Sequence, residues 1–228
     1  MSEQAAKAER TTKALLAGPE KRLLTAMASR LPSWIVPDHL TGLALVAALG
    51  IAASYGLSNR NPTWLWGANL GLALHWLGDS LDGTLARVRK SERPRYGFYV
   101  DHLADALSTI AIGLGLGLSP YMLLAVGFAI VIAYLTLSIN VYLETLVVEQ
   151  FRYGYGVLGP TEARILLIVL NSCALFFGPM PFSLGPLLVT PFDVVGVGAA
   201  LAMAALLVTR TARNLRHLSR LEPPRRKD

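Results

Sequence analysis

Charged residues are scarce in this chain and cysteine is nearly absent. Of the 228 residues only 16% are charged, whereas a soluble globular domain carries about 25%. Hydrophobic residues make up 53%, the mean hydropathy is +0.46, and the apolar residues come in long runs. Cys173 is the single cysteine, which excludes an intramolecular disulfide and gives no sign of thiol or zinc chemistry. We therefore expect a membrane domain rather than one or two soluble domains.

Six segments are apolar enough to cross a bilayer as helices, which takes roughly 20 mostly apolar residues each. The predicted spans are Leu40–Leu57, Trp64–Leu85, Leu103–Leu118, Met122–Leu143, Ile165–Phe177 and Val194–Val208. With these six spans, every lysine and arginine except Arg60 falls on the same side of the membrane. Under the positive-inside rule that side is the cytoplasm, and both termini lie there.

The expected fold class is all-α, a six-transmembrane-helix bundle that forms a single membrane domain over residues 1-228. Residues 1-39 hold a cytoplasmic tail and an amphipathic helix, residues 40-213 the six transmembrane helices, and residues 214-228 a basic cytoplasmic tail. The basic residues behind the formal charge of +6 lie on the predicted cytoplasmic side of the membrane. They therefore indicate anionic lipid as a partner and no nucleic acid.

An amphipathic pattern precedes the first span. Leu23, Leu24, Met27 and Leu31 recur at helical spacing among basic residues, and Pro32 ends the pattern. This predicts an N-terminal interfacial amphipathic helix on the cytoplasmic leaflet. The alternative is a soluble helix that packs on the protein's own cytoplasmic face.

Four aspartates lie near the cytoplasmic ends of the second and third spans, where an ionised side chain is costly. Asp79 and Asp82 are three residues apart and Asp101 and Asp105 four apart, so each pair shares one face of its helix. Facing each other, the carboxylates would repel unless a cation lay between them. Their oxygens suit Mg²⁺ or Mn²⁺, and four carboxylates can hold two ions.

The alternative for these aspartates is helix capping combined with salt bridges to nearby arginines. Asp101, at a helix start, fits a cap. Asp79 and Asp82 do not, because they lie inside a helix near its C-terminus, where the macrodipole disfavours anions.

The neighbouring residues fit a phosphate substrate bound by such ions. Gly83 and Ala86 leave one helix face bare, so a ligand can approach the backbone closely. Arg87, one turn past Gly83, can neutralise a diphosphate. Gly97 is expected to relieve backbone strain where the chain re-enters the membrane after the loop Val88–Tyr96.

This run resembles the signature of the CDP-alcohol phosphotransferase (CDP-alcohol phosphatidyltransferase) family. The family pattern is Asp-x-x-Asp-Gly-x-x-Ala-Arg, a spacer, and then Gly-x-x-x-Asp-x-x-x-Asp. All eight fixed positions are present, and they are Asp79, Asp82, Gly83, Ala86, Arg87, Gly97, Asp101 and Asp105. The spacer is one residue longer than the commonest family form. Six spans and cytoplasmic termini also agree with the family, so the resemblance covers most of the chain.

The resemblance implies a phospholipid-synthesising enzyme that moves a phospho-alcohol or phosphatidyl group from a CDP-linked donor to a hydroxyl acceptor and releases CMP. It implies that Asp79, Asp82 and Asp101 ligate two ions of Mg²⁺ or Mn²⁺, with Asp105 as a further ligand or as the catalytic base. The residues implied to line the CDP site are Gly83, Ala86, Arg87, Gly97 and Thr41.

Thr41 belongs to a second, weaker match, the run Pro37-Asp38-His39-Leu40-Thr41 before the first span. It resembles a Pro-Asn-x-Ile/Leu-Thr element that lies near the nucleotide in this family, with Asp38 in place of the usual asparagine. The alternative is that Asp38 caps the first span.

The substrate is predicted from fewer residues. His102, a candidate catalytic base, resembles the choline/ethanolamine phosphotransferase branch, as does the Thr161-Glu162 pair, although helix capping also explains the pair. These residues favour CDP-choline or CDP-ethanolamine with diacylglycerol. The alternative is a CDP-diacylglycerol-dependent phosphatidyltransferase with an acceptor such as glycerol phosphate or inositol phosphate. The basic residues available to such an acceptor are Arg89, Arg93, Arg152 and Arg164.

Three further features complete the prediction. His75, one turn before Asp79, is either a hydrogen-bond partner of that carboxylate or a satisfied buried histidine. Gly113 and Gly117 pack helices together or join two chains, and we expect a homodimer.

A transporter would need acidic residues along a path through the membrane. Here they cluster near the inner edge, apart from Asp193 near an outer loop, which favours an enzyme.

Overall fold

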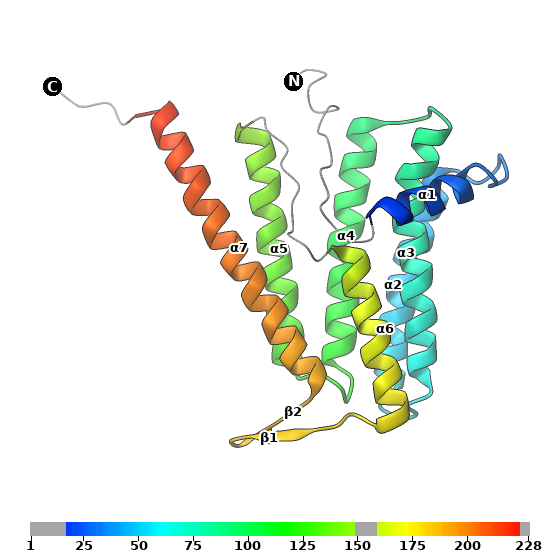
Figure 1. The fold of residues 1–228 in the computed structure, drawn as a ribbon, viewed down its shortest axis with the longest axis vertical. Coiled ribbons are helices and arrows are strands. Elements are labelled where there is room, and N and C mark those ends of the chain that lie inside the picture. The colour runs from blue at the N-terminus through cyan, green and yellow to red at the C-terminus, as the bar shows by residue number, and fades with distance from the viewer. Residues whose placement is uncertain (1–16, 149–158, 224–228) are drawn as a thin grey trace.

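The computed structural model describes residues 17–148 and 159–223, which form seven helices and one short hairpin (Figure 1). The elements in chain order are α1 (Ala17–Ala28), α2 (Pro37–Leu57), α3 (Trp64–Val88), α4 (Pro94–Gly117), α5 (Leu124–Val148), α6 (Pro160–Phe177), β1 (Phe182–Leu184), β2 (Leu187–Val189) and α7 (Pro191–Leu221). The two strands pair antiparallel between α6 and α7. The predicted all-α class is therefore confirmed, with this hairpin as an addition.

Every predicted span falls on one of the helices α2 to α7, but α4 begins nine residues before the predicted start and α7 ends thirteen residues after the predicted end. Four of them, α2, α5, α6 and α7, are long and apolar enough to cross a membrane. The helices α3 and α4 have 25 and 24 residues, but they carry the aspartates and several arginines, which lower their hydropathy. The described residues thus contain four candidate spans, and the six-span topology stays a prediction.

Prolines mark the beginnings of α2, α4, α6 and α7, where a fixed φ suits a helix and the missing N–H is not needed. At α4 this corrects a prediction. Because Pro94 starts the helix, the loop after α3 is limited to residues 89–93, and Gly97 lies inside α4 instead of relieving a loop.

Polar residues at the other end of the bundle have structural partners. Asp193 accepts a hydrogen bond from the Thr190 N–H at 2.8 Å, which caps α7, and another from the Leu123 N–H at 2.7 Å. This acid near the predicted outer loop therefore fastens α7 to the turn before α5.

A buried polar chain joins three helices in the core. The Tyr55 hydroxyl of α2 donates to Asn171 of α6 at 3.1 Å, and the Asn171 amide donates to Asn69 of α3 at 2.8 Å. Tyr55 and Asn171 are fully buried among apolar side chains. Because buried polar groups need partners, this chain holds α6 at one position against α2 and α3.

Two close helix contacts depend on glycine. A Cβ at Gly78 of α3 would lie 2.5 Å from the Leu40 carbonyl oxygen and 2.8 Å from the Ala44 nitrogen of α2. A Cβ at Gly127 of α5 would lie 2.7 Å from the Gly113 carbonyl oxygen and 3.1 Å from the Gly117 Cα of α4. The second contact confirms that Gly113 and Gly117 pack helices within the chain, and the predicted homodimer stays a prediction.

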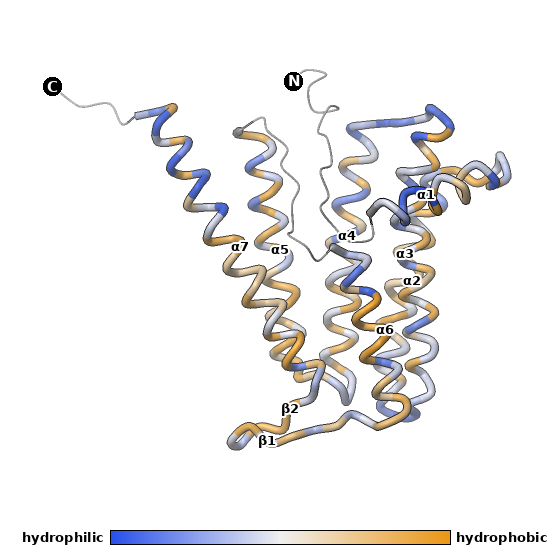
Figure 2. Tube along the Cα trace, in the orientation of Figure 1, coloured by the Kyte–Doolittle hydropathy of each residue, from blue (hydrophilic) through white to orange (hydrophobic). Residues whose placement is uncertain are grey.

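The helix α1 lies across one end of the bundle against α3 (Figure 1). Leu24 and Ala28 are buried together with Leu81 and Leu85 of α3, whereas Leu23 is 52% exposed. The apolar face that was predicted to enter the leaflet is therefore largely covered by the protein itself, as the alternative interpretation expected. Figure 2 shows that hydrophilic residues gather at this end of the helices.

Candidate active site

Asp82 lies in the last turns of α3 and is held from two directions. The Thr41 hydroxyl of α2 donates to Asp82 Oδ2 at 2.6 Å, and the Gly83 N–H donates to Asp82 Oδ1 at 2.5 Å. The close approach of α2 and α3 at Gly78 brings Thr41 within reach. Each carboxylate oxygen thus has a donor, which fixes the side chain's orientation.

Of the other three aspartates, Asp79 lies on α3 with Asp82, and Asp101 and Asp105 lie on α4. Asp82 and Asp105 each interact electrostatically with both Asp79 and Asp101. These four signature carboxylates, which lie on two helices within electrostatic range of one another, are called the acidic cluster below.

Arg164 of α6 supplies a counter-charge to this cluster. Its Nη2 lies 2.5 Å from Asp79 Oδ2, and the two side chains are 12% and 23% exposed. The alternative interpretation, salt bridges to arginines, thus holds for Asp79, but the partner comes from the fifth predicted span. A charged hydrogen bond in this half-buried setting ties α6 to α3 beside the site.

The four aspartates supply the donor atoms that a divalent cation needs. Carboxylate oxygens are hard ligands that suit Mg²⁺ and Mn²⁺, and their mutual repulsion falls when a cation binds between them. Within residues 17–148 and 159–223, however, no three acidic, histidine or cysteine side chains converge closely enough to form a finished metal site. The donor set thus fits a metal ion by the type of its oxygen ligands and not by a preformed geometry.

The helix face next to Asp82 is open. A Cβ built at Gly83 would meet only the Arg87 guanidinium, at 3.4 Å. Arg87 is exposed, and its Nη2 donates to the Thr84 hydroxyl at 3.0 Å. Ala86 is half-buried beside them. A ligand can thus reach the backbone of α3 between the carboxylates and the guanidinium of Arg87.

His102 is packed between two aromatic rings. Its ring centroid lies 4.1 Å from that of Phe98 and 4.8 Å from that of Tyr142. Its Nδ1 lies 2.7 Å from the Phe98 carbonyl oxygen. Because a carbonyl only accepts, Nδ1 donates here and Nε2 is the nitrogen that can take up a proton. The catalytic role of His102 stays a prediction.

Asp38 does not cap α2, so the alternative interpretation of the run Pro37–Thr41 is wrong. Pro37 is the first residue of the helix and Val36 the capping residue, so Asp38 lies in the first turn. Its carboxylate pairs with Arg93 and accepts a hydrogen bond from the Tyr96 hydroxyl at 3.4 Å. Asp38 thus connects the start of α2 to the start of α4.

The arginines that were predicted to hold a phosphorylated acceptor have protein partners. Arg89 donates to the carbonyl oxygens of Leu31 at 3.0 Å and Pro32 at 2.8 Å, which fixes the segment after α1. Arg93 pairs with Asp38, and Arg164 pairs with Asp79 as described. Arg152 lies outside the described residues.

Glu20 of α1 is a neighbour of the site that sequence patterns did not reveal. Its carboxylate accepts hydrogen bonds from Trp76 Nε1 at 2.7 Å and from the Thr161 hydroxyl at 2.9 Å. Trp76 and Thr161 each lie three residues before a member of the Asp79–Arg164 pair. Glu20 therefore joins α3 to α6 one helical turn away from that pair.

Two other predictions have mixed outcomes. Glu162 accepts a hydrogen bond from the Gly159 N–H at 2.9 Å, so the capping interpretation holds for it, whereas Thr161 contacts Glu20. His75 is 5% exposed, and among the described residues its Nδ1 has no hydrogen-bond partner. Neither a hydrogen bond from this atom to Asp79 nor a fully satisfied histidine is therefore observed.

A bundle of apolar helices with an acidic cluster at one end defines a membrane-embedded protein with a polar site. The family model for CDP-alcohol phosphatidyltransferase matches residues 34–210, from the approach to α2 into α7, and includes all four aspartates. A comparison with curated proteins gave no match.

The chain therefore belongs to the CDP-alcohol phosphatidyltransferase family, as its signature predicted. It is a transferase of phosphorus-containing groups that serves phospholipid synthesis with a CDP-linked alcohol as donor. Together with four helices long enough to cross a bilayer, this makes it an integral membrane enzyme.

Proposed function

We propose that this enzyme transfers the phospho-alcohol of CDP-choline or CDP-ethanolamine to diacylglycerol and releases CMP. The observation that carries the reaction is the cluster of Asp79, Asp82, Asp101 and Asp105 on α3 and α4. The choice of donor is supported by His102 and the Thr161-Glu162 pair, which resemble the choline/ethanolamine branch.

Asp79, Asp82 and Asp101 would hold two Mg²⁺ or Mn²⁺ ions, with Asp105 as a further ligand or as the base. When bound, such ions neutralise the donor's diphosphate and stabilise the attacking and the leaving oxygen. Thr41 and the Gly83 N–H hold the Asp82 carboxylate in one orientation. The open face of α3 at Gly83 and Ala86 leaves room for the CDP moiety, and Arg87 lies beside it with a positive charge.

The transfer itself exchanges one phosphorus–oxygen bond for another. The acceptor's hydroxyl oxygen bonds to the phosphorus that carries the alcohol, the bond from that phosphorus to CMP breaks, and CMP leaves with the bonding electrons. Asp105 receives the hydroxyl proton as general base, with His102 Nε2 as the alternative acceptor of that proton. Asp105 is half-buried on α4 and belongs to the cluster itself.

A second candidate is phosphatidyl transfer from CDP-diacylglycerol to a phosphorylated alcohol such as glycerol phosphate or inositol phosphate. Arg164 favours it, because this guanidinium already lies at the cluster and can exchange Asp79 for a phosphate. Arg89 and Arg93 support it less, since loop carbonyls and Asp38 bind them.

The proposal also includes the arrangement in the membrane. Six spans with both termini in the cytoplasm place the cluster at the cytoplasmic edge of the bilayer, where water-soluble CDP-linked alcohols are available. We further propose a homodimer as the working form of the enzyme.

CMP release tests the proposal directly. The purified protein is incubated with Mg²⁺ or Mn²⁺ and with CDP-choline, CDP-ethanolamine or CDP-diacylglycerol, each with its matching acceptor. We expect CMP from the first two donors in the presence of diacylglycerol. CMP from CDP-diacylglycerol and glycerol phosphate alone would establish the second candidate, and no CMP from any donor would contradict both.

A further inference from the structure

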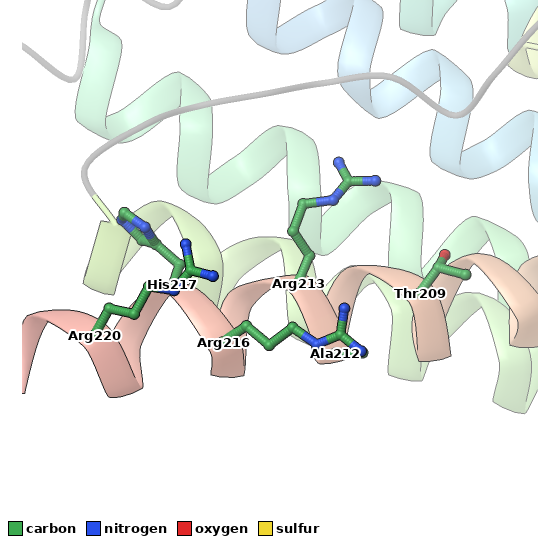
Figure 3. A pocket seen from close by; sticks show the side chains of 6 residues that line it. All are labelled: Thr209, Ala212, Arg213, Arg216, His217 and Arg220. Atoms are coloured by element: carbon green, nitrogen blue, oxygen red, sulfur yellow. The ribbon is translucent and has the colours of Figure 1, made fainter. Parts of the chain in front are cut away.

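A groove outside the acidic cluster follows the end of α7 (Figure 3). Its volume is about 610 Å³, and it is lined by Thr209, Ala212, Arg213, Arg216, His217 and Arg220. These positions recur every three or four residues and therefore share one face of the helix. Apart from Thr209 they all lie beyond residue 210, where the match to the family model ends.

The groove is positively charged and lacks a balancing acid in the described part of the chain. Arg213, Arg216 and Arg220 form no ion pair or side-chain hydrogen bond with residues 17–148 or 159–223. The helix has no acidic residue after Asp193, and Glu222, which follows its last residue, forms no ion pair with these arginines. Like charges three or four residues apart destabilise a helix, so a bound anion would relieve a strain built into this face.

The neighbouring arginine shows the contrast. Arg210, at the near end of the groove, lies 3.6 Å from Glu144 of α5, and both side chains are largely buried. One helical turn further on, the arginines have left the contact with α5 and project from an exposed stretch of α7. Figure 3 shows Arg213 extending away from the helix.

The groove begins where the apolar part of α7 ends. The predicted span closes at Val208, and the groove starts at Thr209 on the same uninterrupted helix. A helix that crosses the bilayer emerges through the layer of lipid head groups, so Arg213 lies near the depth of the lipid phosphates. Arg216 and Arg220 follow one and two helical turns further out. Long arginine side chains readily extend toward that layer.

We propose that this groove binds the head-group phosphate of an anionic phospholipid through Arg213, Arg216 and Arg220. The planar guanidinium donates paired hydrogen bonds to phosphate oxygens. Three positive charges on one face are more than the phosphate charge of a single zwitterionic head group can balance. The site is separate from the donor site, because it contains no carboxylate to hold a metal ion and lies on a different helix. The inference rests on α7 crossing the membrane and not on the proposed substrate.

Native mass spectrometry of the full-length protein in detergent tests the site by titration with phosphatidylglycerol or phosphatidylcholine. We expect phosphatidylglycerol to bind at least about tenfold more tightly than phosphatidylcholine, given the attraction of each basic residue to anionic lipid. The variant R213Q/R216Q/R220Q should lose this preference. Its matched control, R225Q/R226Q/K227Q, removes three positive charges that follow the groove in sequence and should keep it.

An equal loss in both variants would show diffuse attraction and overturn the site, as would no loss in R213Q/R216Q/R220Q. Full displacement of the lipid by millimolar inorganic phosphate would show a free-phosphate site and would also contradict the proposal. If the triple variant does not fold, R216Q alone should weaken phosphatidylglycerol binding several-fold, and unchanged binding in R216Q would then overturn it.

Discussion

Among single residues, Thr41 has the most specific contact with the acidic cluster. Its hydroxyl reaches from α2 to Asp82 Oδ2 at 2.6 Å, and the side chain is buried. A hydrogen bond to a charged group contributes about 1.5–3 kcal/mol. Thr41 therefore holds one carboxylate in a fixed orientation at a place where orientation decides how a ligand is bound.

We expect Thr41→Val, which removes the hydroxyl but keeps the shape, to lower kcat for CMP release roughly tenfold or more. Thr41→Ser should restore most of the rate because it returns the hydroxyl. The matched control is Thr136→Val on α5, since within the described segments the Thr136 hydroxyl bonds only to carbonyls of its own helix. Equal rates in Thr41→Val and the unmodified enzyme would contradict a role for this contact.

Glu20 shows how one side chain connects three elements near the site. Through Trp76 and Thr161 it links α1 to α3 and α6, one turn from the Asp79–Arg164 pair. The separation of α3 and α6 at the cluster thus depends partly on α1.

We expect Glu20→Ala to lower the free energy of unfolding by about 1–3 kcal/mol and to reduce CMP release, because both donors lose their acceptor. Glu20→Gln should behave nearly like the unmodified protein, since an amide oxygen can accept both hydrogen bonds. Unfolding and kcat are measured on the same samples. Similar losses in Glu20→Gln and Glu20→Ala would indicate that the hydrogen bonds do not matter and that only the negative charge does.

At the scale of helix pairs, Gly78 sets the distance between α2 and α3. We expect Gly78→Ala to destabilise the protein by about 1–3 kcal/mol, because its Cβ would lie 2.5 Å from a backbone oxygen that cannot move aside. The control is Gly50→Ala on α2, where a Cβ meets nothing within 4 Å and alanine favours the helix. Thermal unfolding in detergent measures both, and equal melting temperatures would contradict the close contact.

At the scale of the whole molecule, the central question is how often the chain crosses the membrane. If α3 crosses it, Asn61 and Ser91 lie on opposite sides, and both residues are exposed. In a Cys173→Ser background, a membrane-impermeant maleimide should label Asn61→Cys in intact cells and Ser91→Cys only after permeabilisation. Labelling of both, or of neither, in intact cells would contradict the six-span topology.

The helices could be predicted from the sequence because long apolar runs and the prolines before them are local signals. The acidic cluster could also be predicted, since helical spacing puts Asp79 with Asp82 and Asp101 with Asp105 on shared faces. The loop after α3 was predicted too long because Pro94 starts α4 within the arginine-rich stretch.

Contacts between distant segments could not be predicted in the same way. The apolar face of α1 gives the same pattern whether it meets lipid or α3, so only the fold decides between them. The partners of Glu20 and of Asp38 come from helices 55 or more residues away, and no spacing rule connects such positions. The salt bridge between Asp79 and Arg164 of α6 could not be predicted for the same reason.

The central claim, that the four aspartates form one metal-dependent site for the transfer, is tested by measuring Mn²⁺ binding by electron paramagnetic resonance together with CMP release. We expect the unmodified enzyme to bind Mn²⁺ and release CMP, and Asp82→Asn and Asp101→Asn each to lose both. Asp38→Asn, an identical change outside the cluster, should keep Mn²⁺ binding. CMP release that persists in Asp82→Asn or Asp101→Asn, or Mn²⁺ binding that is unaffected by both, would contradict the claim.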